Sequence, residues 1–348
     1  MLAYDPDYFL SQFEIPHIRS SKPVDIMNFI NYFNLDSYEN DQPFFCHYSE
    51  ILPQQNKLLT KKPMALISAA SYKNLMPFPV IFYPEHMIMT YKTNHSLDRL
   101  RHINIPKDKP FLADVLMGHH KMHRWQIVNR IISNGLQDRC LISLKEGPYI
   151  KLKECDWMKR QFPKWGYPRN IISQSLDQFD DPEIIKLRSL DVFDSTTKVE
   201  SMNNAWVSRI LPNKIYDASW ISIVAETNCG NHIFFPTEKI AKPLIDGRLF
   251  LAIGGKDYLK NLRNIGFETF YEFIDESYDK YESQYERVDK MIQTLIELSK
   301  ENMYLLYKKI LPILTHNQMH ARSMQSMTSN LGSFLLGCEI GVKYQPKS

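Results

Sequence analysis

Charged and hydroxyl side chains between residues 226 and 242 have the chemistry to bind a ligand that carries both sugar and phosphate. Glu226 follows a strand-like run at 220–225, and Thr237-Glu238-Lys239 opens a helix after a short loop. Thr237 is a good N-cap, and the free amides behind it form an anion site to which Lys239 and Lys242 would add positive charge. Carboxylates repel phosphate but accept hydrogen bonds from sugar hydroxyls. This mixture of charges favours a sugar diphosphate.

These side chains stand at the ends of predicted strands. The runs 220–225 and 249–253 read as strands, and a helix follows each. Open α/β sheets bind ligands in the crevice outside the carboxyl ends of their strands. Gly254-Gly255 would leave no side chain between the backbone and a ligand, and would free φ for a tight turn. The alternative is a plain turn before a helix at 257–266.

A second strand-helix-strand unit carries a basic cluster. A strand at 111–117, a helix at 122–134 and a strand at 140–144 enclose His119, His120, His123 and Arg124. At a strand end, Arg124 would pair with phosphate, and a histidine, or Glu226, would assist deprotonation of an acceptor hydroxyl. The alternative is a solvated helix start in which these groups pair locally. His119 and His123 have the spacing of zinc ligands, but no third ligand is signalled nearby, so we expect no metal.

The Thr237 block with its flanks resembles the Thr-Glu-Lys signature of α1,3-fucosyltransferase-type glycosyltransferases of the GT-B fold. Residues from about 110 to about 298 also resemble a group of viral proteins, mainly from bacteriophages. The shared segments are Gly118–Arg124, Leu136–Asp138, Leu259–Phe270 with Ile265 in place of leucine, and Ile274–Asp279. Where the classical fucosyltransferases have Phe-Glu-Asn-Ser, this chain has Ala225-Glu226-Thr227-Asn228, so GDP-fucose is not the assumed donor.

The resemblance implies an α/β fold of two facing Rossmann-like domains with a cleft between them, and metal-independent transfer of a sugar from a nucleotide-sugar co-substrate. By this resemblance Glu238 would contact the donor's sugar or ribose, Lys239 its phosphates and Glu226 the neighbouring hydroxyls. A later segment, Glu276-Ser277, would touch the base or ribose, or cap the long helix that follows. The expected donor-binding residues are Arg124, Thr227, Thr237, Glu238, Lys239, Lys242, Gly254, Gly255, Glu276 and Ser277.

Composition sets the remaining bounds. The 348 residues, 44% hydrophobic, suffice for two domains, and a net charge of +3 creates no global field that demands nucleic acid. Five widely spaced cysteines without a CxxC pair fit a reducing compartment. Neither a secretory signal nor a spanning helix is visible, so we expect a cytoplasmic protein, in the host cytoplasm if viral, without a membrane partner.

The expected domain plan has three parts. An acceptor-side α/β domain takes residues 1–200, with strands at 64–69, 80–83, 87–91, 111–117 and 140–144 and an insertion at 145–200. The nucleotide-sugar domain takes 201–315 and includes a helix at 278–311 that ends at Pro312. A tail at 316–348 would pack back on the first domain.

The sequence does not identify the acceptor. One hypothesis is hydroxymethylated pyrimidine in double-stranded phage DNA, which requires phosphate-contacting residues around the cleft. Lysines and arginines in candidate segments, Lys107 and Lys109 among them, would supply these contacts. A glycan or protein acceptor is an alternative, and so is a viral protein that binds a nucleotide or glycan without catalysis. A different nucleotide-using enzyme is disfavoured, because GxGxxG and GxxxxGK[ST] are both absent.

Overall fold

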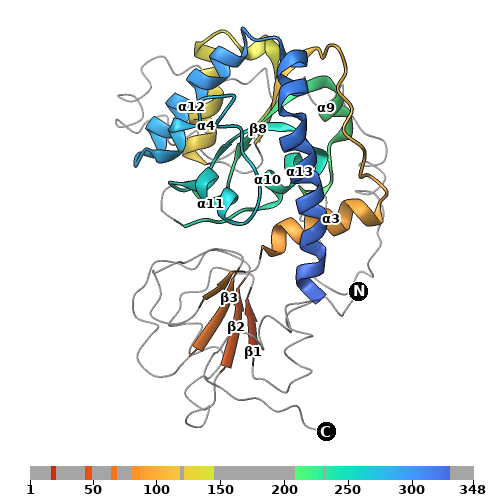
Figure 1. Cartoon of the computed structure of the whole chain (residues 1–348). Coiled ribbons are helices and arrows are strands. Elements are labelled where there is room, and N and C mark those ends of the chain that lie inside the picture. The colour runs from red at the N-terminus through yellow and green to blue at the C-terminus, as the bar shows by residue number, and fades with distance from the viewer. Residues whose placement is uncertain are drawn as a thin grey trace, which may run out of the picture.

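The computed structural model describes residues 17–20, 44–48, 64–68, 80–82, 84–117, 121–144, 208–229 and 233–329 (Figure 1). These residues form two four-stranded sheets in which every neighbouring pair of strands is parallel. The first sheet has the order β1-β2-β3-β4, from β1 (His17–Ser20), β2 (Phe44–Tyr48), β3 (Met64–Ser68) and β4 (Val80–Phe82). The second has the order β6-β5-β7-β8, from β5 (Phe111–Met117), β6 (Cys140–Leu144), β7 (Ser219–Ala225) and β8 (Leu249–Ile253).

The second sheet is built from apolar strands because helices cover both of its faces. All seven residues of β7 and all five of β8 are buried. β5 lies between its partners: Ala113 pairs with Cys140 of β6 on one side and with Ile221 of β7 on the other. The strand order therefore reverses between β5 and β7, which is the arrangement of a Rossmann-like sheet.

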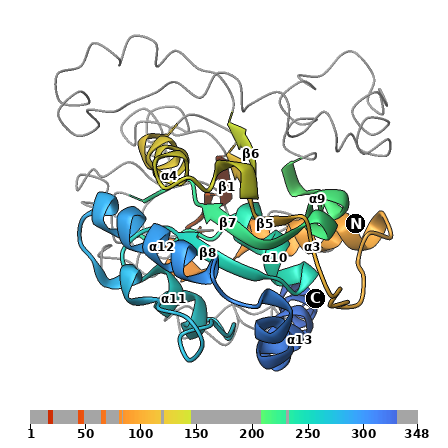
Figure 2. The ribbon, with the colours of Figure 1, turned by 90° about the horizontal axis from the view of Figure 1, so that it is seen from above.

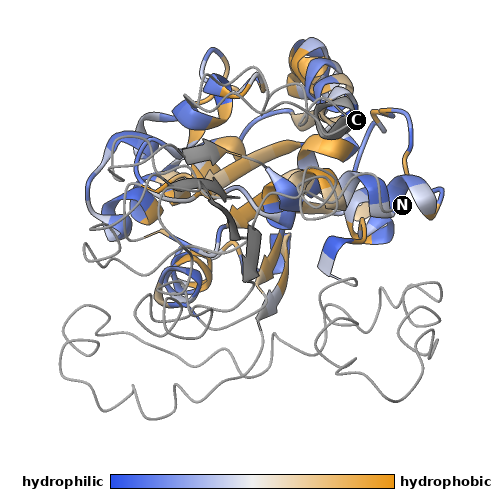
Figure 3. Cartoon of the chain, turned by 90° about the horizontal axis from the view of Figure 1, so that it is seen from below, coloured by the Kyte–Doolittle hydropathy of each residue, from blue (hydrophilic) through white to orange (hydrophobic). Residues whose placement is uncertain are grey.

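Helices form the two outer layers around this sheet. Figure 2 shows α4 (Met122–Ser133) on one side of the strands and α13 (Met303–Ser329) on the other. α12 (Gln284–Leu298) packs on α4, whereas α10 (Glu238–Asp246) and α3 (Glu85–Ser96) pack with α13. Hydrophobic residues line the strands and polar residues the outer parts of the helices (Figure 3). Short helices complete this part of the chain: η3 (Gln137–Arg139), α9 (Asn213–Ala218), α11 (Tyr258–Asn264) and η5 (Ser277–Lys280).

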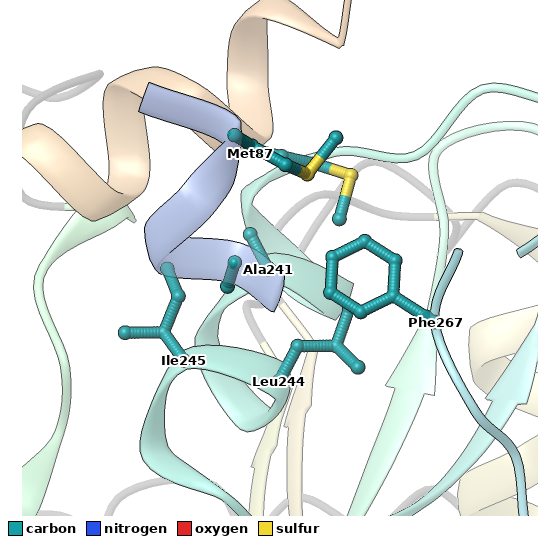
Figure 4. Close-up of a pocket in the computed structure, with 7 residues that line it drawn as sticks. Met87, Ala241, Leu244, Ile245 and Phe267 are labelled. Atoms are coloured by element: carbon teal, nitrogen blue, oxygen red, sulfur yellow. The ribbon is translucent and has the colours of Figure 1, made fainter. Parts of the chain in front are cut away.

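The strand predicted at 87–91 is wrong, because this segment lies in the twelve-residue helix α3. Met87, Ile88 and Tyr91 are buried, and their spacing of three and four residues places them on one helix face. Met87 meets Ala241, Leu244 and Ile245 of α10 and Phe267 after α11 in a small apolar crevice (Figure 4). α3 thus fixes α10, the helix that carries the Thr-Glu-Lys block.

The helix predicted at 278–311 is divided. α12 ends at Leu298, and α13 begins at Met303 after Asn302, whose side chain accepts a hydrogen bond from the Leu305 amide at 3.1 Å. Pro312 lies inside α13 instead of ending it. Pro312 is exposed, so its ring lies on the outer side of α13.

The domain boundary predicted at residue 200 separates strands that pair in one sheet. β5 and β6 precede that residue and β7 follows it, yet all three belong to one sheet. The expected tail is in part the end of α13, which packs on α3 and α10. Residues 330–348 and the insertion expected at 145–200 lie outside the described residues.

Candidate functional site

The carboxyl ends of β5 and β7 and the start of α10 form the ligand-binding edge expected for this strand order. Thr237 has an extended backbone, with φ −116° and ψ −172°, and its side chain accepts a hydrogen bond from the Lys239 amide at 3.3 Å. This is the geometry of an N-cap. The prediction that Thr237 begins the helix is confirmed.

Lys239 contacts the other polar side chains at this edge. Its Nζ atom lies 2.6 Å from Glu238 Oε1 and donates to Thr227 Oγ1 and Thr237 Oγ1, each at 3.3 Å. The side chains of Glu238 and Lys239 keep 16% and 22% of their surface exposed. We call Thr227, Thr237, Glu238 and Lys239 the Lys239 cluster. Its pair of opposite charges is desolvated in part and still reachable from solvent.

Electrostatics keep this cluster charged. Burial alone would raise the pKa of Glu238, but Lys239, His86 and Lys242 together lower it to about 2. Lys242 is half-buried one turn along α10, and burial lowers its pKa, although Glu238 partly opposes this effect. Glu238 is therefore a carboxylate at neutral pH, a hydrogen-bond acceptor beside cations.

The Glu226 carboxylate is held by hydrogen bonds inside the protein. Glu226 is fully buried, and its carboxylate accepts hydrogen bonds from the Thr237 amide at 3.1 Å, from Thr237 Oγ1 at 2.5 Å and from the Tyr258 hydroxyl at 2.8 Å. The protein's own anion thus sits at the start of α10, where a phosphate was expected. These bonds give Glu226 a structural role, and its expected role as a base stays a prediction.

Gly254 has a packing role in place of the expected ligand approach. A Cβ atom at this position would lie 2.1 Å from Cδ2 of Tyr258, so the Tyr258 ring fills the space that the missing side chain leaves. Its φ is outside the left-handed region, so the expected conformational freedom is not used. Gly255 is buried beside it. The glycine lets Tyr258 reach Glu226.

His123 and Arg124 also bind the protein's own backbone. His123 Nε2 lies 3.0 Å from the Glu226 carbonyl oxygen, and Arg124 Nη2 donates to the Ala225 carbonyl at 3.0 Å. The exposed fractions of the two residues are 4% and 2%. Burial and the neighbouring Arg124 charge lower the pKa of His123 to about 3, so it is neutral at physiological pH. Both side chains fix the end of β7 in this structure, whereas Arg124 was expected to pair with donor phosphate and His123 to assist deprotonation.

Glu276 and Ser277 are separate from the cluster in their contacts. Glu276 accepts hydrogen bonds from the Phe270 amide at 2.7 Å and from Thr269 Oγ1 at 2.8 Å, and forms an ion pair with Arg263 at 3.1 Å. These bonds close the loop after α11. The cap of α12 is Ser283, not Glu276. Ser277 is exposed, and its amide donates to Asp275. Glu276 thus binds groups of the protein itself, and its expected contact with a ligand stays a prediction.

Comparison with protein-family models, curated proteins and solved structures gave no match for this chain.

His119 and His120, the two remaining candidates for the catalytic base, lie outside the described residues. Within the part of the chain that the structure describes, no group of three or more metal-ligating side chains occurs. Over the same residues, no helix is long and apolar enough to cross a membrane.

Sequence reasoning missed a second polar cluster at the opposite edge of the sheet. Asp114 of β5 forms a fully buried ion pair with Arg248 at 2.9 Å and accepts hydrogen bonds from Ser219 and Ser222. Arg248 immediately precedes β8, so this cluster lies toward the amino ends of the strands. Buried charges with all partners in place are retained for structure. An aspartate within an otherwise apolar strand was the available signal.

Lys109 belongs to this opposite edge. Its Nζ atom donates to the carbonyl oxygens of Tyr216 at 2.6 Å and Ser219 at 2.9 Å, and burial lowers its pKa to about 7. It joins the segment before β5 to the junction of α9 and β7. Lys109 thus has a structural role at the amino ends of the strands, and its expected contact with DNA stays a prediction.

The site that remains is the Lys239 cluster with Lys242 on α10. It offers two ammonium groups for phosphate oxygens, one carboxylate acceptor for a hydroxyl and the Thr227 hydroxyl. Such a set suits a ligand that combines an anion with hydroxyl groups.

Proposed function

We propose that this chain is a nucleotide-sugar-dependent glycosyltransferase whose donor site is centred on Lys239. The observation that carries the proposal is the partly buried but solvent-accessible Lys239 cluster, in which one ammonium group bridges a carboxylate and two hydroxyl oxygens. A donor phosphate would replace the hydroxyl contacts of Lys239, while Glu238 would accept hydrogen bonds from the sugar or ribose.

The position of the cluster supports this assignment. It lies at the carboxyl end of β7, beside the point at which the strand order reverses between β5 and β7. Nucleotide ligands of Rossmann-like sheets bind at such a reversal. The buried Glu226, His123 and Arg124 then serve the site indirectly, because they hold the end of β7 and the start of α10 in place.

A two-domain GT-B arrangement is part of the proposal. The first parallel sheet would belong to the acceptor-side domain and the second sheet to the donor domain, with the division between β4 and β5. This places the boundary about a hundred residues earlier than residue 200. The acceptor would then enter between the two sheets, opposite the Lys239 cluster.

The proposed reaction is an exchange of bonds at the anomeric carbon. An acceptor hydroxyl oxygen forms a bond to this carbon, and the bond from the carbon to the diphosphate oxygen breaks. Lys239 and Lys242 would stabilise the negative charge that develops on the leaving diphosphate. The acceptor proton passes to a base, and no group of the described site requires a metal for these steps. We propose inversion of the anomeric centre.

For the acceptor we propose hydroxymethylated pyrimidine in double-stranded DNA, in a viral and cytoplasmic setting. This part rests on the resemblance to bacteriophage proteins. A glycan or protein hydroxyl is the alternative acceptor.

One observation favours a second candidate function, binding without catalysis. Glu226 and His123, two of the four side chains with the chemistry expected of a base, are buried in structural contacts. A viral protein that keeps the fold to bind a nucleotide or glycan would have the same features. Turnover separates the two functions.

The test is a transfer assay with duplex DNA that contains hydroxymethylcytosine or hydroxymethyluracil, and with unmodified DNA as control. Each of a panel of nucleotide sugars is added, and released nucleoside diphosphate and digested nucleosides are measured by mass spectrometry. We expect one donor to add one sugar to the hydroxymethylated base, and Lys239→Ala to reduce the rate roughly 100-fold. Diphosphate release without DNA modification would reassign the acceptor. A panel that yields no release would favour the binding protein.

A further inference from the structure

We infer that His86 is the acid-base residue of the candidate site, contributed by α3 opposite the start of α10. This inference rests on the proposed glycosyltransferase function and adds to it the group that takes the acceptor proton. It replaces His123 and Glu226, whose side chains are buried in contacts with the protein itself.

The packing of the two helices places His86 at the site. α3 packs along α10, and the His86 ring meets the Phe235 ring edge-on, with centroids 5.5 Å apart and planes at 83°. Phe235 is buried two residues before Thr237, the N-cap of α10. His86 is only half-buried, in contrast to His123. The imidazole therefore packs on the segment that leads into the N-cap of α10 and remains partly open to solvent.

The first turn of α3 holds His86 in position. The Thr90 hydroxyl donates to the His86 carbonyl oxygen at 2.6 Å, and the Met87 and Ile88 side chains next to it are buried in the core. These contacts hold the backbone of residue 86, and the edge-on contact with Phe235 restrains its ring. Such positioning is what proton transfer to a bound substrate requires.

Charge complementarity links His86 to Glu238. Of the groups that hold the pKa of Glu238 low, Lys239 and Lys242 come from α10, whereas His86 comes from α3. The carboxylate would in turn stabilise the imidazolium that forms when His86 accepts a proton. A histidine next to a carboxylate is a recurring general-base arrangement.

The proposed step balances in protons and electrons. As the acceptor oxygen bonds to the anomeric carbon, its proton passes to His86. The electron pair of the broken bond leaves with the nucleoside diphosphate, whose charge Lys239 and Lys242 neutralise. The imidazolium then returns its proton to water through its exposed side.

The experiment compares His86→Gln with His95→Gln in the full chain. His95 lies on the same helix, is exposed and stacks on Tyr91, so it is a matched histidine outside the site. Donor affinity is measured by titration calorimetry with the nucleotide sugar that the wild-type chain binds. Release of nucleoside diphosphate is followed from pH 5 to pH 9, with water or the acceptor present.

We expect His86→Gln to bind the donor within about twofold of the wild type, to lose roughly 100-fold in rate, and to lose the acidic limb of the pH profile. His95→Gln should match the wild type in all three. An unchanged rate and profile in His86→Gln, with donor bound, would overturn the inference but leave the proposed donor site standing. Absence of donor binding in the wild type would overturn both.

If the wild type binds donor but releases no diphosphate, a second measurement tests whether His86 lies at the donor site. It asks whether bound donor protects His86 from chemical modification. Diethyl pyrocarbonate modifies accessible imidazoles, and mass spectrometry reports the extent at His86 and His95. Bound donor should slow modification of His86 at least fivefold and leave that of His95 unchanged. Equal modification with and without donor would exclude His86 from the site.

Discussion

At the scale of single residues, the feature that most changes the interpretation of the site is the buried carboxylate of Glu226. The sequence could predict that Glu226 ends a strand and that Thr237 begins a helix, because both signals are local. It could not predict the hydrogen bond from the Tyr258 hydroxyl to Glu226, which joins residues 32 positions apart. A residue of catalytic type is therefore a structural anchor.

This assignment predicts that Glu226→Gln destabilises the fold. The substitution turns one carboxylate oxygen into an amide donor that faces other donors, and it removes charge from the remaining hydrogen bonds. We expect the free energy of unfolding in urea to fall by about 3 kcal/mol, and Tyr258→Phe to cost about 1.5 kcal/mol.

Glu282→Gln is the matched control, because this glutamate side chain is 67% exposed and pairs with Lys256 on the surface. Its effect should stay below about 0.5 kcal/mol. Full stability of Glu226→Gln would contradict the structural role and return Glu226 to the list of possible bases.

At the scale of secondary structure, periodicity predicted most of the second sheet and failed where apolar runs are short. Strands β5, β6 and β8 have the predicted limits, which are 111–117, 140–144 and 249–253. The segment 87–91 is a short, mostly apolar run that fits a strand equally well, and in the structure it forms a helix that packs on α10. Short apolar runs do not distinguish the two structures.

The turn between β8 and α11 requires a residue without a side chain at position 254. Gly254→Ala would place a Cβ atom against the Tyr258 ring, which cannot move without losing its bond to Glu226. We expect a loss of about 3 kcal/mol in the free energy of unfolding. The comparison is Gly135→Ala, where φ is +69° and nothing lies within 4 Å.

Gly135→Ala should cost only ~1 kcal/mol, from the left-handed backbone alone. Urea unfolding of both variants measures the difference. If Gly254→Ala lowered the free energy of unfolding no more than Gly135→Ala does, the Tyr258 ring could move aside. Gly254 would then not be needed for packing.

At the scale of the whole molecule, sheet order determines where a ligand can bind. The sequence predicted two strand-helix-strand units but divided the chain at residue 200. Pairing of β5 with β7 joins segments about a hundred residues apart, and no local pattern reports it. The reversal next to the Lys239 cluster follows from this pairing, so the site could be proposed from sequence but located only from the fold.

The central claim is that the Lys239 cluster binds a nucleotide sugar. The most direct measurement is thermal unfolding of the wild type, Lys239→Ala and Lys256→Ala with a panel of nucleotide sugars. Lys256 is the matched control, because its ion-pair partner is Glu282 and not a residue of the cluster. We predict that one nucleotide series stabilises the wild type and Lys256→Ala, by about 2.7 kcal/mol at a ligand concentration of about 100 times Kd, and leaves Lys239→Ala unchanged. Absence of any shift in the wild type, or an equal shift in Lys239→Ala, would contradict the claim.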